Sequence, residues 1–148
     1  ERKDGSHLKT AIFKNKNLND MKVVTSRNHR NETLEKLINK IKFKEKITMG
    51  SIGCKIASIV RGESDIYICL SLPGGSSPKD WDFAAPEAIL KGSGGAITNL
   101  DNKELVYNKT NFEQGGIIIA SNNKQKHGLI CLEIKELIKK FDLYPLSS

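Results

Sequence analysis

Residues 46–60 read KITMGSIGCKIASIV and combine a short strand pattern with a helix pattern. Lys46 to Met49 fit a strand, and Gly50-Ser51 turn the chain into a helix. The apolar residues of that helix recur at helical spacing: Ile52, Ile56, Ile59 and Val60. Gly62 then ends it. A strand that passes directly into a helix is typical of α/β proteins.

The same alternation continues on both sides of this stretch. We expect strands at 8–14, 23–25, 46–49, 65–70, 96–98, 104–107 and 116–120. We expect helices around 34–41, 52–60, 82–91 and 124–140. Strands alternating with helices predict an α/β fold with a mainly parallel or mixed sheet of about five strands between helices.

Length and composition exclude several classes of protein. The 148 residues suffice for one domain with its own core, and 38% hydrophobic with 28% charged residues is typical of a soluble globular protein. No apolar run approaches the ~20 residues of a membrane-spanning helix. The cysteines are scattered and form no Cys-x-x-Cys pair: Cys54, Cys69 and Cys131. We therefore expect no disulfide framework, no zinc site and a cytoplasmic location.

The net charge of +7 raises the question of nucleic-acid binding. The chain has 20 Lys and 4 Arg, whereas specific phosphate and base recognition favours the bidentate guanidinium of Arg. The charge therefore indicates a Lys-rich surface, and we expect no nucleic-acid partner.

Two strand-to-helix junctions carry candidate anion contacts, because helix N-termini present free N–H groups. The first, residues 25–30, places Arg27 and His29 where the helix dipole favours acids, unless an anion binds there. A solvated loop that caps the helix is the alternative. The second has Gly50 and Ser51 at a helix start with Lys55 in the first turn, a phosphate site in miniature or an ordinary cap.

A third junction lies at residues 78–87. Pro86 suggests that the regular helix begins only about there, with Asp82 at its entrance. A carboxylate in that place caps the helix or binds a hard cation such as Mg²⁺. Trp81 is expected to pack rather than to stack on a substrate.

These motifs resemble a known family. Trp81-Asp82-x-Ala84-Ala85-Pro86, followed by Ser93-Gly94-Gly95-Ala96-Ile97-Thr98 and Asp101-Asn102-Lys103, is similar to the C-terminal signature of the inositol monophosphatase superfamily of metal-dependent, lithium-sensitive phosphomonoesterases. The Ser26-Arg27-x-His29 and Gly50-Ser51-x-Gly53-x-Lys55 turns and Pro86 resemble its 3'(2'),5'-bisphosphate nucleotidase branch, which acts in sulfur assimilation. The likeness covers about residues 21–121 and implies the fold of that family's C-terminal domain.

The resemblance implies roles for individual residues. Asp82 would be the catalytic residue and a Mg²⁺ ligand, with Li⁺ as an inhibitor. The nucleotide and its non-reacting phosphate would be bound by Ser26, Arg27, His29, Gly50, Ser51 and Lys55. The strand before the Trp-Asp motif reads Tyr67-Ile68-Cys69 where inositol-specific members have an acidic contact, which counts against an inositol phosphate. The Arg that several nucleotidases place near Cys69 is also absent, and Lys79 is a candidate substitute.

Other metal motifs of the family do not occur in the sequence. These are a Glu-Glu pair and an Asp-Pro-x-Asp-Gly-Thr motif, and residues 3–6 are only a superficial echo of the second. One carboxylate cannot hold the cations that phosphoryl transfer needs, so we expect the chain alone to be a poor catalyst. Residues 1–20 are then interpreted as a leftover strand segment of a missing N-terminal domain, and 21–148 as the C-terminal α/β domain.

The sequence therefore predicts the C-terminal part of a Mg²⁺-dependent 3'(2'),5'-bisphosphate nucleotidase that converts adenosine 3',5'-bisphosphate to AMP and phosphate. Two alternatives stay open: a phosphatase for inositol or sugar phosphates, and a phosphate- or nucleotide-binding module without catalysis. Exposed edges in the N-terminal segment also predict self-association between chains.

Overall fold

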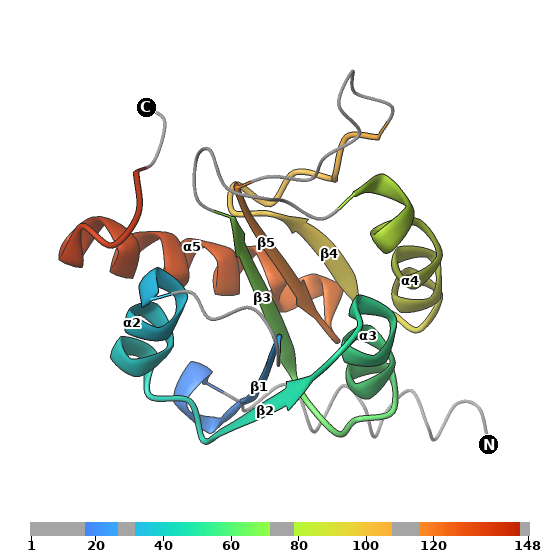
Figure 1. Ribbon diagram of the computed structural model, residues 1–148, viewed down its shortest axis with the longest axis horizontal. Helices are drawn as coiled ribbons and strands as arrows, with labels where there is room; N and C mark the ends of the chain where they lie inside the picture. Colours follow the sequence, from blue (N-terminus) through green and yellow to red (C-terminus); the bar gives the residue numbers. More distant parts are fainter. Residues whose placement is uncertain (1–16, 27–31, 72–78, 108–115, 146–148) are drawn as a thin grey trace.

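The computed structural model describes residues 17–26, 32–71, 79–107 and 116–145, and confirms the predicted α/β class. Strands and helices alternate along most of the chain (Figure 1). In chain order the elements are η1 (Leu18–Asp20), β1 (Lys22–Ser26), α2 (Glu32–Ile41), β2 (Glu45–Met49), α3 (Ile52–Val60), β3 (Ile66–Ser71), α4 (Asp80–Gly92), β4 (Ala96–Asn99), β5 (Gly116–Ser121) and α5 (Lys124–Phe141).

The described strands form a five-stranded sheet in the order β2-β1-β3-β5-β4. β1 pairs in parallel with β2 on one side and with β3 on the other. β5 runs antiparallel to both β3 and β4. The sheet is therefore mixed. The carboxyl ends of β1, β2, β3 and β4 lie at one edge of it, together with the amino end of β5.

Helices cover both faces of the sheet (Figure 1). α2 and α5 lie on one face, and α3 and α4 lie side by side on the other. Successive residues of a strand point to opposite faces. Val23 therefore packs in the first cluster and Val24 in the second, and Ile66 and Tyr67 divide in the same way.

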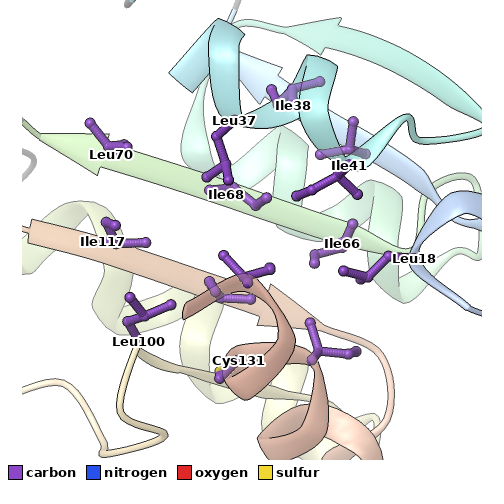
Figure 2. Packing of buried hydrophobic residues seen from close by; sticks show 14 of the residues in the cluster. Leu18, Leu37, Ile38, Ile41, Ile66, Ile68, Leu70, Leu100, Ile117 and Cys131 are labelled. Atoms are coloured by element: carbon purple, nitrogen blue, oxygen red, sulfur yellow. The ribbon is translucent and has the colours of Figure 1, made fainter. Parts of the chain in front are cut away.

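The larger core lies between α2, α5 and the sheet. Figure 2 shows Leu37 of α2 directed toward Ile68 of β3, with Ile117 of β5 and Cys131 of α5 in the same cluster. These side chains are buried, and each fully buried aliphatic side chain stabilises the fold by about 1.5–3 kcal/mol. The helical spacing recognised in the sequence is thus the spacing that this core requires.

Three expectations about the elements need correction or remain outside the described residues. α4 begins at Asp80 rather than near Pro86, which lies inside the helix. Residues 104–107 form no strand, and Glu104 makes only an isolated bridge to Thr98. The predicted strand 8–14 lies outside the described part of the chain.

The end of the N-terminal segment is joined to the α/β core. Leu18 is buried in the larger cluster, and a capping box between Asn17 and Asp20 closes the turn of η1. Whether a domain boundary falls near residue 20 stays a prediction. Among the described helices, none combines the length and apolar character needed to cross a membrane.

Gly95 joins α4 to β4 at a point where the backbone packs tightly. A Cβ atom on Gly95 would lie 2.5 Å from the carbonyl oxygen of Ser121 and 2.6 Å from Cδ1 of Leu90. Real Cβ atoms do not approach backbone oxygen so closely. The Gly94-Gly95 pair of the sequence motif therefore serves the packing of β4 against β5, with Gly94 at a φ of +91°.

We expect Gly95→Ala to lower the free energy of unfolding by about 1–3 kcal/mol, because the added methyl group forces β4 and β5 apart. Urea denaturation measures this loss. The matched control is Gly92→Ala, since a Cβ there meets nothing within 4 Å and alanine favours a helix. Equal stability of Gly95→Ala and wild type would contradict the packing role.

His127 links β4, β5 and α5 through contacts of its two ring nitrogens. Its Nε2 lies 2.7 Å from Thr98 Oγ1, and its Nδ1 lies 2.7 Å from Ser121 Oγ. Because the Thr98 hydroxyl donates to the carbonyl of Asn99 at 2.8 Å, it accepts from Nε2–H. Nδ1 then accepts from Ser121. This set of bonds needs a neutral imidazole, and burial lowers the pKa of His127 to about 4.

We expect acid to weaken the fold through His127. Its pKa is about 4 in the folded chain against an ordinary value of 6.5, so the unfolded chain binds the extra proton between these values. The stabilisation is complete above pH 6.5 and falls as the pH drops toward 4, by about 3 kcal/mol over that range. Urea unfolding at several pH values tests this. His127→Gln should flatten the dependence in that window, and a variant as acid-sensitive as wild type would assign the effect elsewhere.

Candidate functional site

Candidate residues for binding meet at the carboxyl edge of the parallel strands. Ser26 ends β1 and pairs in register with Met49, which ends β2 and precedes Gly50. α3 begins just beyond this point, at Ile52, and α4 lies beside α3 on the same face of the sheet (Figure 1). The fold therefore brings Ser26 to the same edge as the turn that opens α3.

The turn at the start of α3 has the predicted cap. The Ser51 hydroxyl oxygen accepts a hydrogen bond from the amide of Cys54, at an N···O distance of 3.1 Å. A Cβ atom on Gly50 would meet no described atom within 4 Å, and one on Gly53 would meet only Ser51 Oγ, at 3.9 Å. Neither glycine has a positive φ. Open space around this turn is what the close approach of a ligand to the backbone requires.

Lys55 is the unusual residue of α3. Its side chain is buried, with 3% of the residue exposed, and its Nζ lies 5.1 Å from the ring centroid of Tyr67. Burial lowers the pKa of Lys55, although negative charge on Cys69 would oppose that shift. No carboxylate of the described residues lies within ion-pair distance of Nζ. A buried cation without a carboxylate is costly, which makes Lys55 a candidate for function.

β3 supplies the side chains around Lys55. Tyr67, Cys69 and Ser71 alternate along the strand, and burial raises the pKa of both Tyr67 and Cys69. Cys69 and Asp82 are both close enough to raise the pKa of Tyr67 further. Lys55 on α3, Tyr67 on β3 and Asp82 on α4 therefore belong to one group of side chains.

Asp82 lies in the first turn of α4, at its predicted place by the helix entrance. Its Oδ2 accepts a hydrogen bond from the backbone amide of Lys79 at 2.9 Å, so the capping interpretation is confirmed. The side chain is half-buried. The cap uses one carboxylate oxygen and leaves the other for a ligand.

The fit of a metal ion to this group is incomplete in the described part of the chain. Mg²⁺ takes oxygen ligands in near-octahedral geometry, and Asp82 supplies one carboxylate. Across residues 17–26, 32–71, 79–107 and 116–145 there is no group of three or more His, Cys, Asp or Glu side chains that could hold a metal. The described residues alone do not make a cation site.

Two predicted binding residues, Arg27 and His29, lie outside the described residues. The expectation that Trp81 packs is wrong, because 68% of Trp81 is exposed. It occupies the second position of α4, whereas Phe83 and Leu90 turn toward the sheet.

The contact between Lys55 and Tyr67 is not among the sequence-based expectations. Tyr67-Ile68-Cys69 served there only to argue against an inositol phosphate. A signal was nevertheless present. Tyr67, Cys69 and Ser71 place a polar atom at every second position of a strand that is otherwise apolar, and such alternation marks one face of a strand. Lys55 could then have been predicted to lie against this face of the strand.

Comparisons with known proteins agree with these observations. A model of the inositol monophosphatase family matches residues 4–139. The mouse 3'(2'),5'-bisphosphate nucleotidase 1 is 31% identical over 103 residues, which are 68% of this chain and 32% of that protein. The 3'(2'),5'-bisphosphate nucleotidase CysQ of Aggregatibacter actinomycetemcomitans is 33% identical over 106 residues, 72% of this chain and 38% of that protein. The chain thus spans about a third of the length of these curated relatives.

The fold also matches solved structures. An IMPase from Thermotoga maritima has a TM-score of 0.61 at 21% sequence identity, and the match covers 85% of this chain and 44% of that protein. At this level of identity the likeness concerns the fold. This likeness of fold covers more of the chain than residues 21–121, which carry the sequence motifs.

We expect Lys55→Met to raise the free energy of unfolding by about 1 kcal/mol, because methionine fills a similar volume without a buried charge. The sign follows from the lowered pKa: the folded state disfavours the ammonium form relative to the unfolded state. Urea denaturation near pH 7 measures the change. Lys36→Met, at an exposed position of α2, is the control and should leave stability within about 0.5 kcal/mol. Destabilisation by Lys55→Met would show that the lysine serves the fold instead.

Proposed function

Because the chain belongs to the inositol monophosphatase family, we propose that it is the substrate-binding part of a Mg²⁺-dependent 3'(2'),5'-bisphosphate nucleotidase. The substrate would be adenosine 3',5'-bisphosphate, and the products AMP and phosphate. The cellular setting we propose is sulfur assimilation in the cytoplasm, with inhibition by Li⁺. The names of the mouse and Aggregatibacter relatives support this choice of substrate.

The buried Lys55 is the observation that carries the proposal. An ammonium group without a carboxylate partner among the described residues strongly favours an anion. A phosphate of the substrate would provide that anion next to the first turn of α3, where amide groups and the positive end of the helix dipole also favour it. Binding a charged substrate would offset the cost of burying the lysine.

Each residue of the site has a proposed task. Lys55 would contact an oxygen of the phosphate that does not react, with Ser51 and the Gly50 backbone at the same turn. Ser26 would donate a hydrogen bond from the end of β1. Arg27 and His29, which lie outside the described residues, would complete the contacts to the nucleotide.

Asp82 would hold Mg²⁺ with the carboxylate oxygen that the cap leaves available. When bound, the ion supplies charge neutralisation at the phosphate and lowers the pKa of a coordinated water. Asp82 also keeps α4 in place through its bond to Lys79, so the helix start fixes the direction of the carboxylate.

A second candidate is a nucleotide- or phosphate-binding module without catalysis. It is favoured by the single carboxylate that the described residues offer to a metal. In that case the 148-residue chain binds the bisphosphate but releases no phosphate.

We expect adenosine 3',5'-bisphosphate to bind the chain about tenfold more tightly than adenosine 3'-monophosphate, because only the bisphosphate carries the 5'-phosphate, which does not react and which Lys55 would contact through a charge-assisted hydrogen bond. Isothermal titration calorimetry measures both affinities. Lys55→Met should remove the preference, whereas the exposed-site control Lys36→Met should keep it. Equal affinity for the two nucleotides, or a preference that survives Lys55→Met, argues against the proposal.

Catalysis is tested by phosphate release with and without Mg²⁺. The sharpest variant is Asp82→Asn, because its amide oxygen can still accept the bond from Lys79 while the negative charge is lost. Release above blank that requires Mg²⁺ and disappears in Asp82→Asn favours the enzyme. Binding without release favours the non-catalytic module.

A further inference from the structure

Lys55 differs from the paired lysines of this chain in the kind of partner that it has. Several lysines form ion pairs with carboxylates: Lys22 with Glu45, Lys46 with Glu35, Lys91 with Glu87, and Lys135 with Asp101. Lys55 is buried, and its Nζ lies against the Tyr67 ring instead. Its surroundings therefore exclude water without neutralising its charge.

Tyr67 is equally buried, with 2% of the residue exposed, and it sits in the core cluster between α3, α4 and the sheet. A cation over an aromatic face gains about 0.5–1 kcal/mol at exposed sites and about 2 kcal/mol when water is excluded. That attraction holds an ammonium group in place but leaves its charge intact. A carboxylate in the same position would neutralise the charge and occupy the N–H donors.

Asp82 is the carboxylate that could have taken this role. It lies close enough to the Tyr67 hydroxyl to affect that group electrostatically, yet among the described residues it forms no ion pair with Lys55. Instead, Asp82 bonds to the backbone of Lys79. Tyr67 thus contacts the Lys55 ammonium through its ring, whereas the Asp82 carboxylate raises the pKa of its hydroxyl group.

We propose that Tyr67 is a positioning residue, whose ring holds the Lys55 ammonium at the site so that its N–H groups can bind a phosphate oxygen. This inference rests on the proposed function, because it takes the ligand of Lys55 to be a phosphate group. It adds a residue from β3 that acts through Lys55 and not by touching the substrate. The hydroxyl of Tyr67 has no part in this role.

Two substitutions separate the ring from the hydroxyl. Tyr67→Phe keeps the aromatic face and should bind inorganic phosphate within about twofold of wild type. Tyr67→Leu removes the face and should weaken phosphate binding about fivefold, the equivalent of one cation–π contact. The affinities come from NMR titration with inorganic phosphate, followed at the Lys55 side chain and at the amides of Gly53 and Cys54.

The control for general loosening of the core is Ile118→Val. Ile118 is buried in the same cluster as Tyr67, whereas the ring over which the Lys55 ammonium lies is that of Tyr67, so phosphate affinity should not change. Because Tyr67→Leu could unfold the chain, a second series places phenylalanine with increasing ring fluorination at position 67. Fluorination removes the negative charge of the ring face with little change in shape, so the affinity should fall in steps.

The outcomes divide clearly. Stepwise loss with fluorination, together with retained affinity in Tyr67→Phe, supports the positioning role. Unchanged affinity across the fluorinated series, equal losses in Tyr67→Phe and Tyr67→Leu, a comparable loss in Ile118→Val, or no phosphate binding by wild type would overturn it.

Failure of the proposed function gives a different result. If phosphate binding depends on the ring but adenosine 3',5'-bisphosphate binds no better than adenosine 3'-monophosphate, the positioning role stands and the nucleotidase proposal fails. If the bisphosphate is preferred but its affinity is the same in wild type and in the Tyr67 ring variants, the nucleotidase proposal stands and the role of Tyr67 is rejected.

Discussion

The parallel pairing of β1 with both β2 and β3 is the constraint on which the site depends. This pairing brings the ends of strands that are distant in sequence to one edge of the sheet. Ser26, Gly50 and the polar end of β3 are neighbours only because these strands run in the same direction. The helices that follow β2 and β3 then start at that edge, where their first amides are free of helical partners. A reversal of β1 relative to β2 would separate Ser26 from Ser51 and Lys55.

Stability and function oppose each other around α3. The helix is closed by the Ser51 cap and buries Ile56 and Ile59, which are ordinary stabilising features. One turn from the cap, it buries an ammonium group that the core would exclude. Local rules of folding tend to fail at functional sites, and Lys55 is such a failure. The Tyr67 ring limits the cost without removing the charge that binding needs.

Much of the fold could be predicted from the sequence because its signals are local. The strands at 23–25, 46–49, 96–98 and 116–120 and the helix at 124–140 follow from apolar spacing, and the structure confirms them within a few residues. The helix predicted at 82–91 is confirmed too, but the expectation that its regular part begins only near Pro86 is wrong, because tertiary packing of Phe83 and Leu90 against the sheet outweighs the local effect of Pro86. The exposure of Trp81 could not be predicted for a related reason, because the side of the helix that faces water depends on where the regular helix begins.

The site was only partly predictable from the sequence. Ser51 and Asp82 were placed correctly at helix starts, because capping depends on neighbours a few residues away. The contact of Lys55 with Tyr67 joins α3 to β3, and its geometry depends on how the helix rotates over the sheet.

The antiparallel direction of β5 has a further consequence. The chain leaves β5 at the opposite edge and α5 covers the face of the sheet that α3 does not, so His127 and Lys55 lie on opposite faces of the sheet. Substitutions around His127 on one face can therefore change the stability of the fold while substitutions around Lys55 on the other face change the choice of ligand.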